Sequence, residues 1–226
     1  MLEIKDLKDI CVIGLGYVGL PTATILANEG FSVLGFDINQ DLIQILKNGK
    51  FEFQEPKLEE LFSKNINLEK LKISTKASTA DVYIICVPTP CTDGKKAELS
   101  FLYAAIENIS SLIKENVLIV IESTIPINTT ENCKKKLLEL RNDLDPEKVF
   151  FAHCPERVLP GNAIFEIINN DRVIGGLSNH ATLLANSIYR KFSKGNIFST
   201  SAKVAEMVKL SENTFRDVNI ALANQL

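Results

Sequence analysis

Short apolar runs alternate along most of the chain with segments of helical periodicity. Strands are predicted at 10–14, 32–37, 81–87, 117–122, 149–154 and 172–176. Helices are predicted between them at 17–28, 40–47, 56–64, 99–113, 130–141 and 181–192. The run at 81–87 is almost continuously apolar, which is typical of a strand that is buried on both faces. The alternation predicts an α/β fold, with a doubly wound parallel sheet and helices on both faces.

The last segment, 201–226, has a different pattern, because neither Gly nor Pro interrupts it. Apolar or small residues recur in it at alternating steps of four and three, at Val204, Val208, Ser211, Phe215, Val218 and Leu222. This spacing forms one stripe of a long helix. The helix has no C-cap signal before Leu226. We therefore expect 1–199 to form one domain, and 200–226 to be the truncated beginning of a central helical domain.

The composition is that of a packed globular protein, with 46% hydrophobic and 23% charged residues. A formal net charge of -3 gives no argument for a nucleic-acid or anionic-membrane partner. The longest apolar runs, such as 117–121, are too short to span a bilayer. The N-terminal residues include no apolar stretch of the signal-peptide kind. These features predict a cytoplasmic protein that binds neither nucleic acid nor membrane.

The cysteines do not suggest a metal site. They are five in number and irregularly spaced, at 11, 86, 91, 133 and 154. There is no CxxC pair, and only His153 and His180 could assist in binding a metal. We predict no bound metal, and we expect Cys11 and Cys86 to act as small hydrophobic residues within strands.

A glycine-rich motif follows the first predicted strand directly. Gly14, Gly16 and Gly19 form G-x-G-x-x-G at the start of the first helix. The first glycine permits a tight turn, the second lets the backbone approach a pyrophosphate, and the third lets helix and strand pack closely. The helix N-terminus would present N–H groups to the phosphates. This context predicts a Rossmann-type dinucleotide-binding domain.

Asp37 ends the second predicted strand, 21 residues after Gly16. A carboxylate there can accept hydrogen bonds from the adenosine ribose and repels a 2′-phosphate. No arginine occurs at 38–40, so the sequence favours NAD over NADP. The alternative is that Asp37 only caps a helix or lies solvated at a strand end.

Four further patches lie past strand ends or on the long helix. They are Val-Pro-Thr-Pro at 87–90, Glu-Ser-Thr at 122–124, His-Cys-Pro-Glu-Arg-Val-Leu-Pro-Gly at 153–161, and the pair Lys209 and Asn213. Ligands of open α/β sheets bind outside the carboxyl ends of the strands, which places the first three patches on the cofactor side. By position alone, Ser123 and Thr124 could equally be turn residues, and Lys209 with Asn213 could be a solvated helix face.

In order and over essentially the whole chain, these motifs resemble the UDP-glucose/GDP-mannose dehydrogenase family. Within the family, 153–161, 170–176 and 205–221 are similar to the UDP-N-acetyl-D-mannosamine dehydrogenase branch. The resemblance implies an NAD-dependent oxidation of the sugar C6 alcohol to a carboxylate, for surface polysaccharide biosynthesis. Two hydrides pass to two NAD⁺, and a cysteine thiolate holds the intermediate as a thioester. UDP-N-acetylglucosamine and UDP-glucose stay open as substrates, and so does a non-catalytic NAD-binding fragment.

The resemblance also assigns roles to individual residues. Lys209 would stabilise oxyanions, Asn213 would donate a hydrogen bond beside it, Thr124 would position water, and Glu156 would be a base or orient that water. The implied cofactor contacts are Gly14, Gly16, Tyr17, Val18, Gly19, Asp37, Pro88, Thr89, Ser123 and Thr124. The implied substrate contacts are Glu156, Arg157, Val158, Leu159, Lys209 and Asn213.

The chain departs from the family's pattern in one respect. The Gly-Gly-His-Cys-Ile-Pro-like segment that carries the family's catalytic cysteine does not occur, and we do not assign Cys154 as the nucleophile, because it lies in a different loop. The resemblance also implies a UDP-binding C-terminal domain, which we expect this chain to lack. We therefore expect the chain to bind NAD⁺ but to be inactive alone, and the full-length form to be a homodimer acting on a UDP-sugar.

Overall fold

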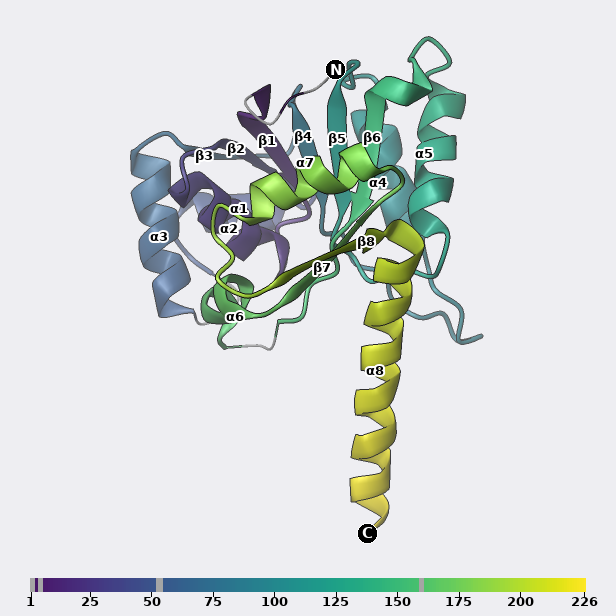
Figure 1. Ribbon diagram of the computed structural model, residues 1–226. Coiled ribbons are helices and arrows are strands. Elements are labelled where there is room, and N and C mark those ends of the chain that lie inside the picture. Colours follow the sequence, from purple (N-terminus) through teal and green to yellow (C-terminus); the bar gives the residue numbers. More distant parts are fainter. Residues whose placement is uncertain (1–2, 4–5, 52–54, 159–160) are drawn as a thin grey trace.

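One mixed sheet forms the centre of the computed structural model, which describes all residues except 1–2, 4–5, 52–54 and 159–160. Its strands are β1 (Asp9–Ile13), β2 (Ser32–Phe36), β3 (Leu71–Ser74), β4 (Val82–Ile85), β5 (Val117–Ile121), β6 (Val149–His153), β7 (Arg172–Gly176) and β8 (Ile197–Ser201). Their order across the sheet is β3-β2-β1-β4-β5-β6-β7-β8 (Figure 1). The chain reverses strand order after β3, which opens a crevice between the ends of β1 and β4.

Helices cover both faces of the sheet and form two hydrophobic cores. On one side lie α1 (Gly19–Asn28), α2 (Gln40–Lys47), α3 (Pro56–Asn67), α6 (Ala163–Asn169) and α7 (Asn179–Tyr189), and on the other lie α4 (Ser100–Ser110) and α5 (Thr129–Leu140). A short 3₁₀ helix, η2 (Pro146–Lys148), precedes β6. Successive residues of one strand enter opposite cores, as Tyr83 and Ile84 do in β4. This two-sided burial explains why the strands read as continuous apolar runs.

The predicted α/β fold is confirmed, and it contains two strands and one α-helix that were not predicted. The sequence patterns did not predict β3, α6 or β8. β3 and β8 lie at the two edges of the sheet, and three of the five residues of β8 are exposed and the other two partly buried, so no apolar run marks it. α6 spans only seven residues.

The direction of β7 is the second difference from the predicted sheet. β7 pairs antiparallel with β6, through Ala152 opposite Gly176 and His153 opposite Gly175. β8 then pairs parallel with β7 after the crossover through α7. The sheet is therefore mostly, but not wholly, parallel. Periodicity does not encode strand direction, because buried strands of either direction have the same apolar run.

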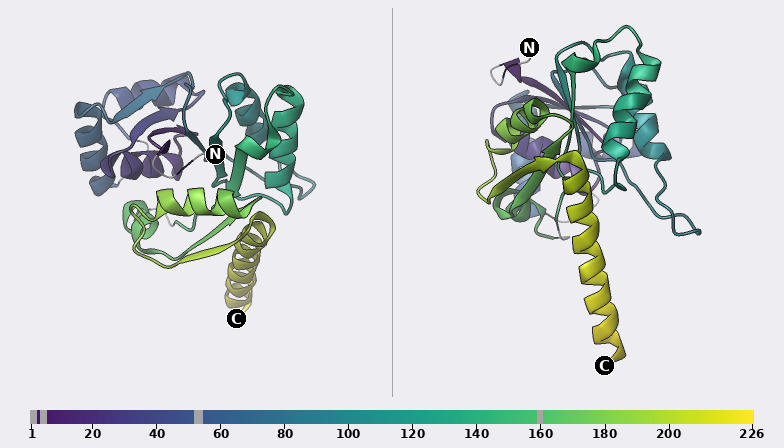
Figure 2. Two further views of the ribbon diagram at one scale, coloured as in Figure 1. Left: turned by 45° about the horizontal axis from the view of Figure 1, so that its top comes forward. Right: turned by 45° about the vertical axis from the view of Figure 1, so that its right-hand side comes forward.

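The long C-terminal helix α8 (Ala202–Gln225) leaves the body of the domain. Figures 1 and 2 show from three sides that it contacts the sheet only by its first turns and then projects away. Ala202, Ala205 and Glu206 are the buried residues of α8. A Cβ on Gly175 would lie 2.2 Å from the Ser201 carbonyl oxygen, so this glycine permits the close approach at which α8 begins.

The predicted apolar stripe of α8 faces solvent. Phe215 is 73% exposed, Val218 61% and Leu222 56%. The predicted domain boundary at 199 falls within β8, a strand of the sheet, and the division itself stays a prediction. In the described part of the chain, no helix has the length and apolar character required to cross a membrane.

Candidate functional site

A cleft of about 590 Å³ lies at the carboxyl ends of β1, β4, β5 and β6, beside α8. Most of the predicted site residues line it: Gly14, Gly16, Tyr17, Val18, Asp37, Pro88, Thr89, Ser123, Thr124, Glu156, Val158, Lys209 and Asn213. Two predicted residues, Gly19 and Arg157, do not line the cleft, and Leu159 lies outside the described residues. Folding thus brings together segments that are up to about two hundred residues apart in the sequence.

The three fingerprint glycines have different steric surroundings. Gly14 has φ +88°, a region that L side chains rarely adopt, and a Cβ on it would lie 2.9 Å from the Cys86 carbonyl oxygen. A Cβ on Gly19 would lie 1.8 Å from the Gly14 carbonyl oxygen, a separation too short for any side chain to be accommodated. A Cβ on Gly16 would meet no atom within 4 Å, since this position faces the open cleft. Gly14 and Gly19 are therefore required by the fold, whereas Gly16 leaves room for a ligand.

Asp37 fixes the loop that contains the glycines. Its Oδ2 accepts a hydrogen bond from the Leu15 N–H at 2.8 Å, and its Oδ1 accepts one from the Asn39 N–H at 2.9 Å. The cap of α2 is Asn39, whose side chain accepts bonds from the N–H groups of residues 41 and 42. Asp37 is therefore not the helix cap, and its half-buried carboxylate lines the cleft.

An apolar slot of about 100 Å³ adjoins Asp37. It is lined by Ile13, Gly14, Phe36, Asp37, Ile38, Val87, Pro88, Phe101, Ala104, Ala105 and Asn108. Two of these residues, Ile38 and Phe101, are exposed hydrophobic side chains. A flat aromatic ring system is the kind of ligand group that such a slot buries.

Two hydroxyl groups join the loops that follow β4 and β5. Ser123 Oγ donates to the Val87 carbonyl oxygen at 2.6 Å, and Thr89 Oγ1 donates to the Thr124 carbonyl oxygen at 2.6 Å. Each loop thus contributes one donor and one acceptor. The Ser123 side chain links two loops, which differs from the local turn role that its position alone allowed.

A buried carboxylate, Glu122, lies in the floor of the cleft. It accepts hydrogen bonds from Tyr189 OH at 2.6 Å, Thr22 Oγ1 at 3.2 Å and Cys86 Sγ at 3.3 Å. Burial raises the pKa of Glu122 to about 6, the nearby Glu156 carboxylate adds to the rise, and Arg172 opposes it. The sequence singled out the Glu-Ser-Thr motif but did not predict the role of this glutamate, because its three hydrogen-bond donors come from distant parts of the chain.

The buried thiols near the cleft are not activated nucleophiles. Burial raises the pKa of Cys154 to about 12 and that of Cys86 well above its ordinary value. A thiol in such surroundings stays protonated at neutral pH. Among the described residues, no group of three or more His, Cys, Asp or Glu side chains is arranged to hold a metal ion.

Glu156 is held by a buried arginine that the sequence patterns did not single out. Arg172 Nη1 lies 2.9 Å from Glu156 Oε2, and the two side chains are only 4% and 6% exposed. Glu156 Oε1 accepts a second bond, from the Arg157 N–H at 2.7 Å. With both oxygens engaged, the carboxylate is better suited to orienting its surroundings than to acting as a general base. The sequence offered one signal for this role: Arg172 is a charged residue in the otherwise apolar segment that forms β7.

Lys209 and Asn213 reach the cleft from α8. The Lys209 ammonium donates a hydrogen bond to the backbone carbonyl oxygen of Glu156. Burial lowers the pKa of Lys209, and the carboxylates of Glu156 and Glu212 partly oppose this. Asn213 Oδ1 accepts from Arg216 Nη2 at 3.4 Å. The pair therefore belongs to the cleft wall, and it is not a fully solvated helix face.

Glu206 fastens α8 to the domain. This fully buried side chain accepts bonds from Thr130 N–H at 2.8 Å and Thr130 Oγ1 at 2.6 Å through Oε1. Its Oε2 accepts from the Asn128 N–H at 2.7 Å. Asn128, the residue before α5, makes no side-chain cap of its own, so the carboxylate from α8 caps α5 in its place. One side chain thus stabilises one helix and positions another.

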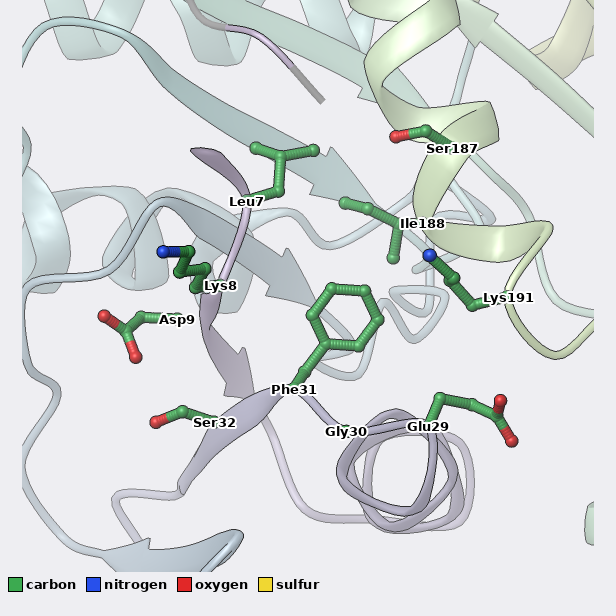
Figure 3. Close-up of a pocket in the computed structure, with 10 residues that line it drawn as sticks. All are labelled: Leu7, Lys8, Asp9, Glu29, Gly30, Phe31, Ser32, Ser187, Ile188 and Lys191. Atoms are coloured by element: carbon green, nitrogen blue, oxygen red, sulfur yellow. The ribbon is translucent and has the colours of Figure 1, made fainter. Parts of the chain in front are cut away.

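A second hollow of about 770 Å³ lies at the opposite end of the sheet, near the start of β1 and β2 and the end of α7 (Figure 3). Phe31 lies in it next to Ile188 and Lys191, and the ends of α1 and α7 form its rim. None of the predicted site residues lines this hollow.

The doubly wound sheet, the glycine loop at its crevice and the acidic residue after β2 together define a dinucleotide-binding domain. Residues 8–193 match the model of the UDP-glucose/GDP-mannose dehydrogenase family, NAD binding domain. The chain belongs to this family, and the matched region is its NAD-binding domain.

The relatives found among known proteins agree with this assignment. UDP-N-acetyl-D-mannosamine dehydrogenase from Methanococcus maripaludis (strain S2) is 50% identical over 224 residues, and the one from Methanocaldococcus jannaschii is 52% identical over 221 residues. These alignments cover 97% and 96% of the chain, but 51% and 50% of the relatives. The solved structure of the Pyrococcus horikoshii UDP-D-ManNAc dehydrogenase has a TM-score of 0.92 and 44% identity, covering 96% of the chain and 52% of that protein. The chain thus spans about half the length of the curated relatives it matches.

Proposed function

We propose that the chain is the cofactor-binding half of an enzyme that oxidises the C6 alcohol of UDP-N-acetyl-D-mannosamine to UDP-N-acetyl-D-mannosaminuronate. The observation that carries the proposal is the single cleft, in which the glycine loop and Asp37 lie at one end and Lys209 and Asn213 at the other. An oxidation by hydride transfer requires both a dinucleotide site and a polar group that stabilises charge beside it.

The lining of the cleft favours one orientation of the bound cofactor. The apolar slot beside Ile38 and Phe101 suits the adenine, and Asp37 suits the ribose diol. The open position at Gly16, next to the N-terminus of α1, suits the pyrophosphate. The nicotinamide end would then extend toward Thr124 and Glu156. NAD⁺ supplies the hydride acceptor, and Asp37 disfavours the 2′-phosphate of NADP.

The α8 end of the cleft suits the reacting sugar. Lys209 can stabilise an anionic oxygen at C6, and Asn213, one turn further along α8, can donate a neutral hydrogen bond to the same group. Thr124 can position water, and Glu156 orients Lys209 through its backbone carbonyl. The thiolate that holds the intermediate would come from the other half of the enzyme, since Cys154 is buried and protonated.

The choice of sugar rests on the names of similar proteins. Relatives from four genera, such as Methanococcus and Pyrococcus, are named UDP-N-acetyl-D-mannosamine dehydrogenases. One relative, from Ralstonia nicotianae, is 42% identical and is named NDP-N-acetyl-D-galactosaminuronic acid dehydrogenase. The other N-acetylhexosamines therefore stay the alternative substrates. Dimerisation of the complete enzyme through the exposed stripe of α8 belongs to the same proposal.

Two titrations test the cofactor assignment. Adding NAD⁺ to the purified chain in a calorimeter should give saturable binding, and NADP⁺ should bind more weakly. Gly16→Ala is the matched control, because its Cβ would point into the cleft without touching the fold. Tighter binding of NADP⁺ than of NAD⁺ would contradict the assignment.

The reaction is tested on a fusion of this chain to the second half of the Methanococcus maripaludis relative. Given NAD⁺ and UDP-N-acetyl-D-mannosamine, the fusion should form two NADH for each sugar oxidised. The absorbance of NADH measures this ratio. UDP-N-acetylglucosamine and UDP-glucose serve as competing substrates. Faster turnover of either one would replace the proposed sugar, and sustained turnover by the unfused chain would contradict its role as a cofactor-binding half.

A further inference from the structure

Two carboxylates lie close to Lys209, and each is paired with an arginine. Glu156 pairs with Arg172 at 2.9 Å, and Glu212 pairs with Arg157 Nε at 2.9 Å. In the part of the chain that the structure describes, Lys209 itself forms no ion pair. Its partner is the neutral backbone carbonyl of Glu156. The half-buried Lys209 ammonium is therefore oriented by the backbone of Glu156, while the carboxylate of Glu156 is paired with Arg172.

The surroundings of Arg172 fix its guanidinium firmly. Besides Glu156, it donates to the Ile167 carbonyl oxygen at 2.8 Å through Nη2. The rings of Tyr189 and Phe192 lie against it, with their centroids 5.1 and 5.3 Å from Cζ. Contact with two aromatic rings together with donation from two nitrogens suits arginine, and lysine does not reproduce it. Arg172 does not line the cleft; it reaches the Lys209 side of the site through its ion pair with Glu156, and it also opposes the rise in the pKa of Glu122.

We propose that Arg172 is a positioning residue for Lys209: by holding the Glu156 carboxylate in a buried ion pair, it keeps the Lys209 ammonium free to meet an anionic oxygen of the substrate. This inference rests on the proposed role of Lys209 in the oxidation. An ammonium that is already paired with a carboxylate would lose much of its ability to stabilise a second negative charge, because the pair is neutral as a whole. Arg172 prevents that pairing, and the carbonyl of Glu156 still supplies the orientation.

The charges around Lys209 make the consequence of losing Arg172 predictable. The groups that face it are His153 at the end of β6, Glu156 and Arg157 from the loop after β6, and Glu212 and Arg216 from α8 itself. Without Arg172, the Glu156 carboxylate would be buried and unpaired, which is costly. Lys209 can take it, since Lys209 already contacts the same residue and the guanidinium of Arg157 is paired with Glu212.

The test measures the pKa of Lys209 in the ligand-free chain, by NMR of lysine labelled with ¹³C at Cε. The Lys209→Arg spectrum identifies the resonance. Arg172→Met should raise the pKa of Lys209 by about one unit or more, the effect of a new carboxylate partner. The double variant Arg172→Met/Glu156→Gln should reverse that rise, because it has no carboxylate to release. An unchanged Lys209 pKa in folded Arg172→Met would overturn the proposal.

A second variant keeps the proposal testable if Arg172→Met does not fold. Glu156→Gln retains Arg172 and should lower the pKa of Lys209 only slightly, because the carboxylate is already engaged by Arg172. A fall of about one unit or more would mean that Glu156 is the direct partner of Lys209, and would overturn the inference. Both measurements are independent of cofactor and substrate. A failure of NAD⁺ to bind would instead contradict the proposed function and leave these results interpretable.

Discussion

At one end of the cleft, the glycine loop is positioned by the Asp37 carboxylate and by close backbone approaches, including that of Cys86, whereas at the other end Lys209 depends on the loop after β6 and on side chains from β7, α5 and α8. We refer to these as the fingerprint end and the α8 end. The fingerprint end depends on the absence of side chains at Gly14 and Gly19, so its shape follows from local sterics. The α8 end depends on buried charges, each of which requires a distant partner. The two ends should therefore respond differently to mutation.

The largest effect is expected at the α8 end, on the reaction itself. In the fusion enzyme, Lys209→Ala should lower kcat by roughly 10²–10³, as for other lost oxyanion donors. NAD⁺ affinity should change little, because the cofactor contacts lie mainly elsewhere in the cleft. Lys203→Ala, a change at an exposed lysine of α8 outside the cleft, is the matched control. Near-normal turnover of the Lys209 variant would assign this lysine a purely structural role.

The fingerprint end should show the largest effect on stability. Gly19→Ala places a Cβ against the Gly14 backbone and should cost about 3 kcal/mol or more of unfolding free energy, because backbone cannot move aside as a side chain can. Gly16→Ala should leave urea unfolding unchanged and weaken NAD⁺ binding. If both variants lost equal stability, the distinction between the two glycines would be incorrect.

A pH dependence is expected from His153, which lies beside the α8 end. Burial lowers the pKa of His153 to about 4 from 6.5, despite its hydrogen bond with the Ile121 carbonyl. Between these values the unfolded chain takes up a proton that the folded chain does not, so stability falls as the pH decreases. The loss from pH 6.5 to 4 should reach about 3 kcal/mol. Urea unfolding of His153→Gln should show a smaller loss over this window, and parallel curves for the two proteins would exclude His153 as the cause.

The attachment of α8 is tested by Glu206→Gln, which removes a buried charge that accepts three hydrogen bonds. We expect a loss of about 2 kcal/mol and faster amide hydrogen exchange in the first turns of α5 and α8. Glu212→Gln, at a partly exposed ion pair of α8, should cost less than about 1 kcal/mol. Equal losses would show that Glu206 does not hold the helix.

The smallest effect is expected for cofactor preference. Asp37→Asn keeps an acceptor for one of the two loop N–H groups but removes the negative charge. NAD⁺ binding should weaken by about 1 kcal/mol, and NADP⁺ binding should weaken less or improve. Parallel titrations of both cofactors measure the ratio. An unchanged ratio would mean that Asp37 serves only the loop, through Leu15 and Asn39.

Sequence patterns predicted the strands that are buried on both faces, because their continuous apolar runs reflect two cores. They did not predict β3, α6 or β8, which are short or lie at an edge, and they did not predict the antiparallel direction of β7. The motifs predicted the cleft residues well where chemistry is concentrated in consecutive positions. Glu122, Arg172 and Glu206 were not assigned roles, since a single charged residue in an apolar segment gives no indication of its partner.

By itself, the sequence determined the α/β class and the dinucleotide fingerprint, and it marked most of the residues that line the cleft, because turns, glycines and apolar runs act over a few neighbouring positions. Only the tertiary structure decided which charges are neutralised and which stay free. Arg172 is paired with Glu156, Arg157 with Glu212, and Lys209 with a carbonyl, and these pairings join segments that no local pattern connects. The reason is physical: the cost of burying a charge depends on the partner that folding brings to it, and that partner is set by the packing of distant elements.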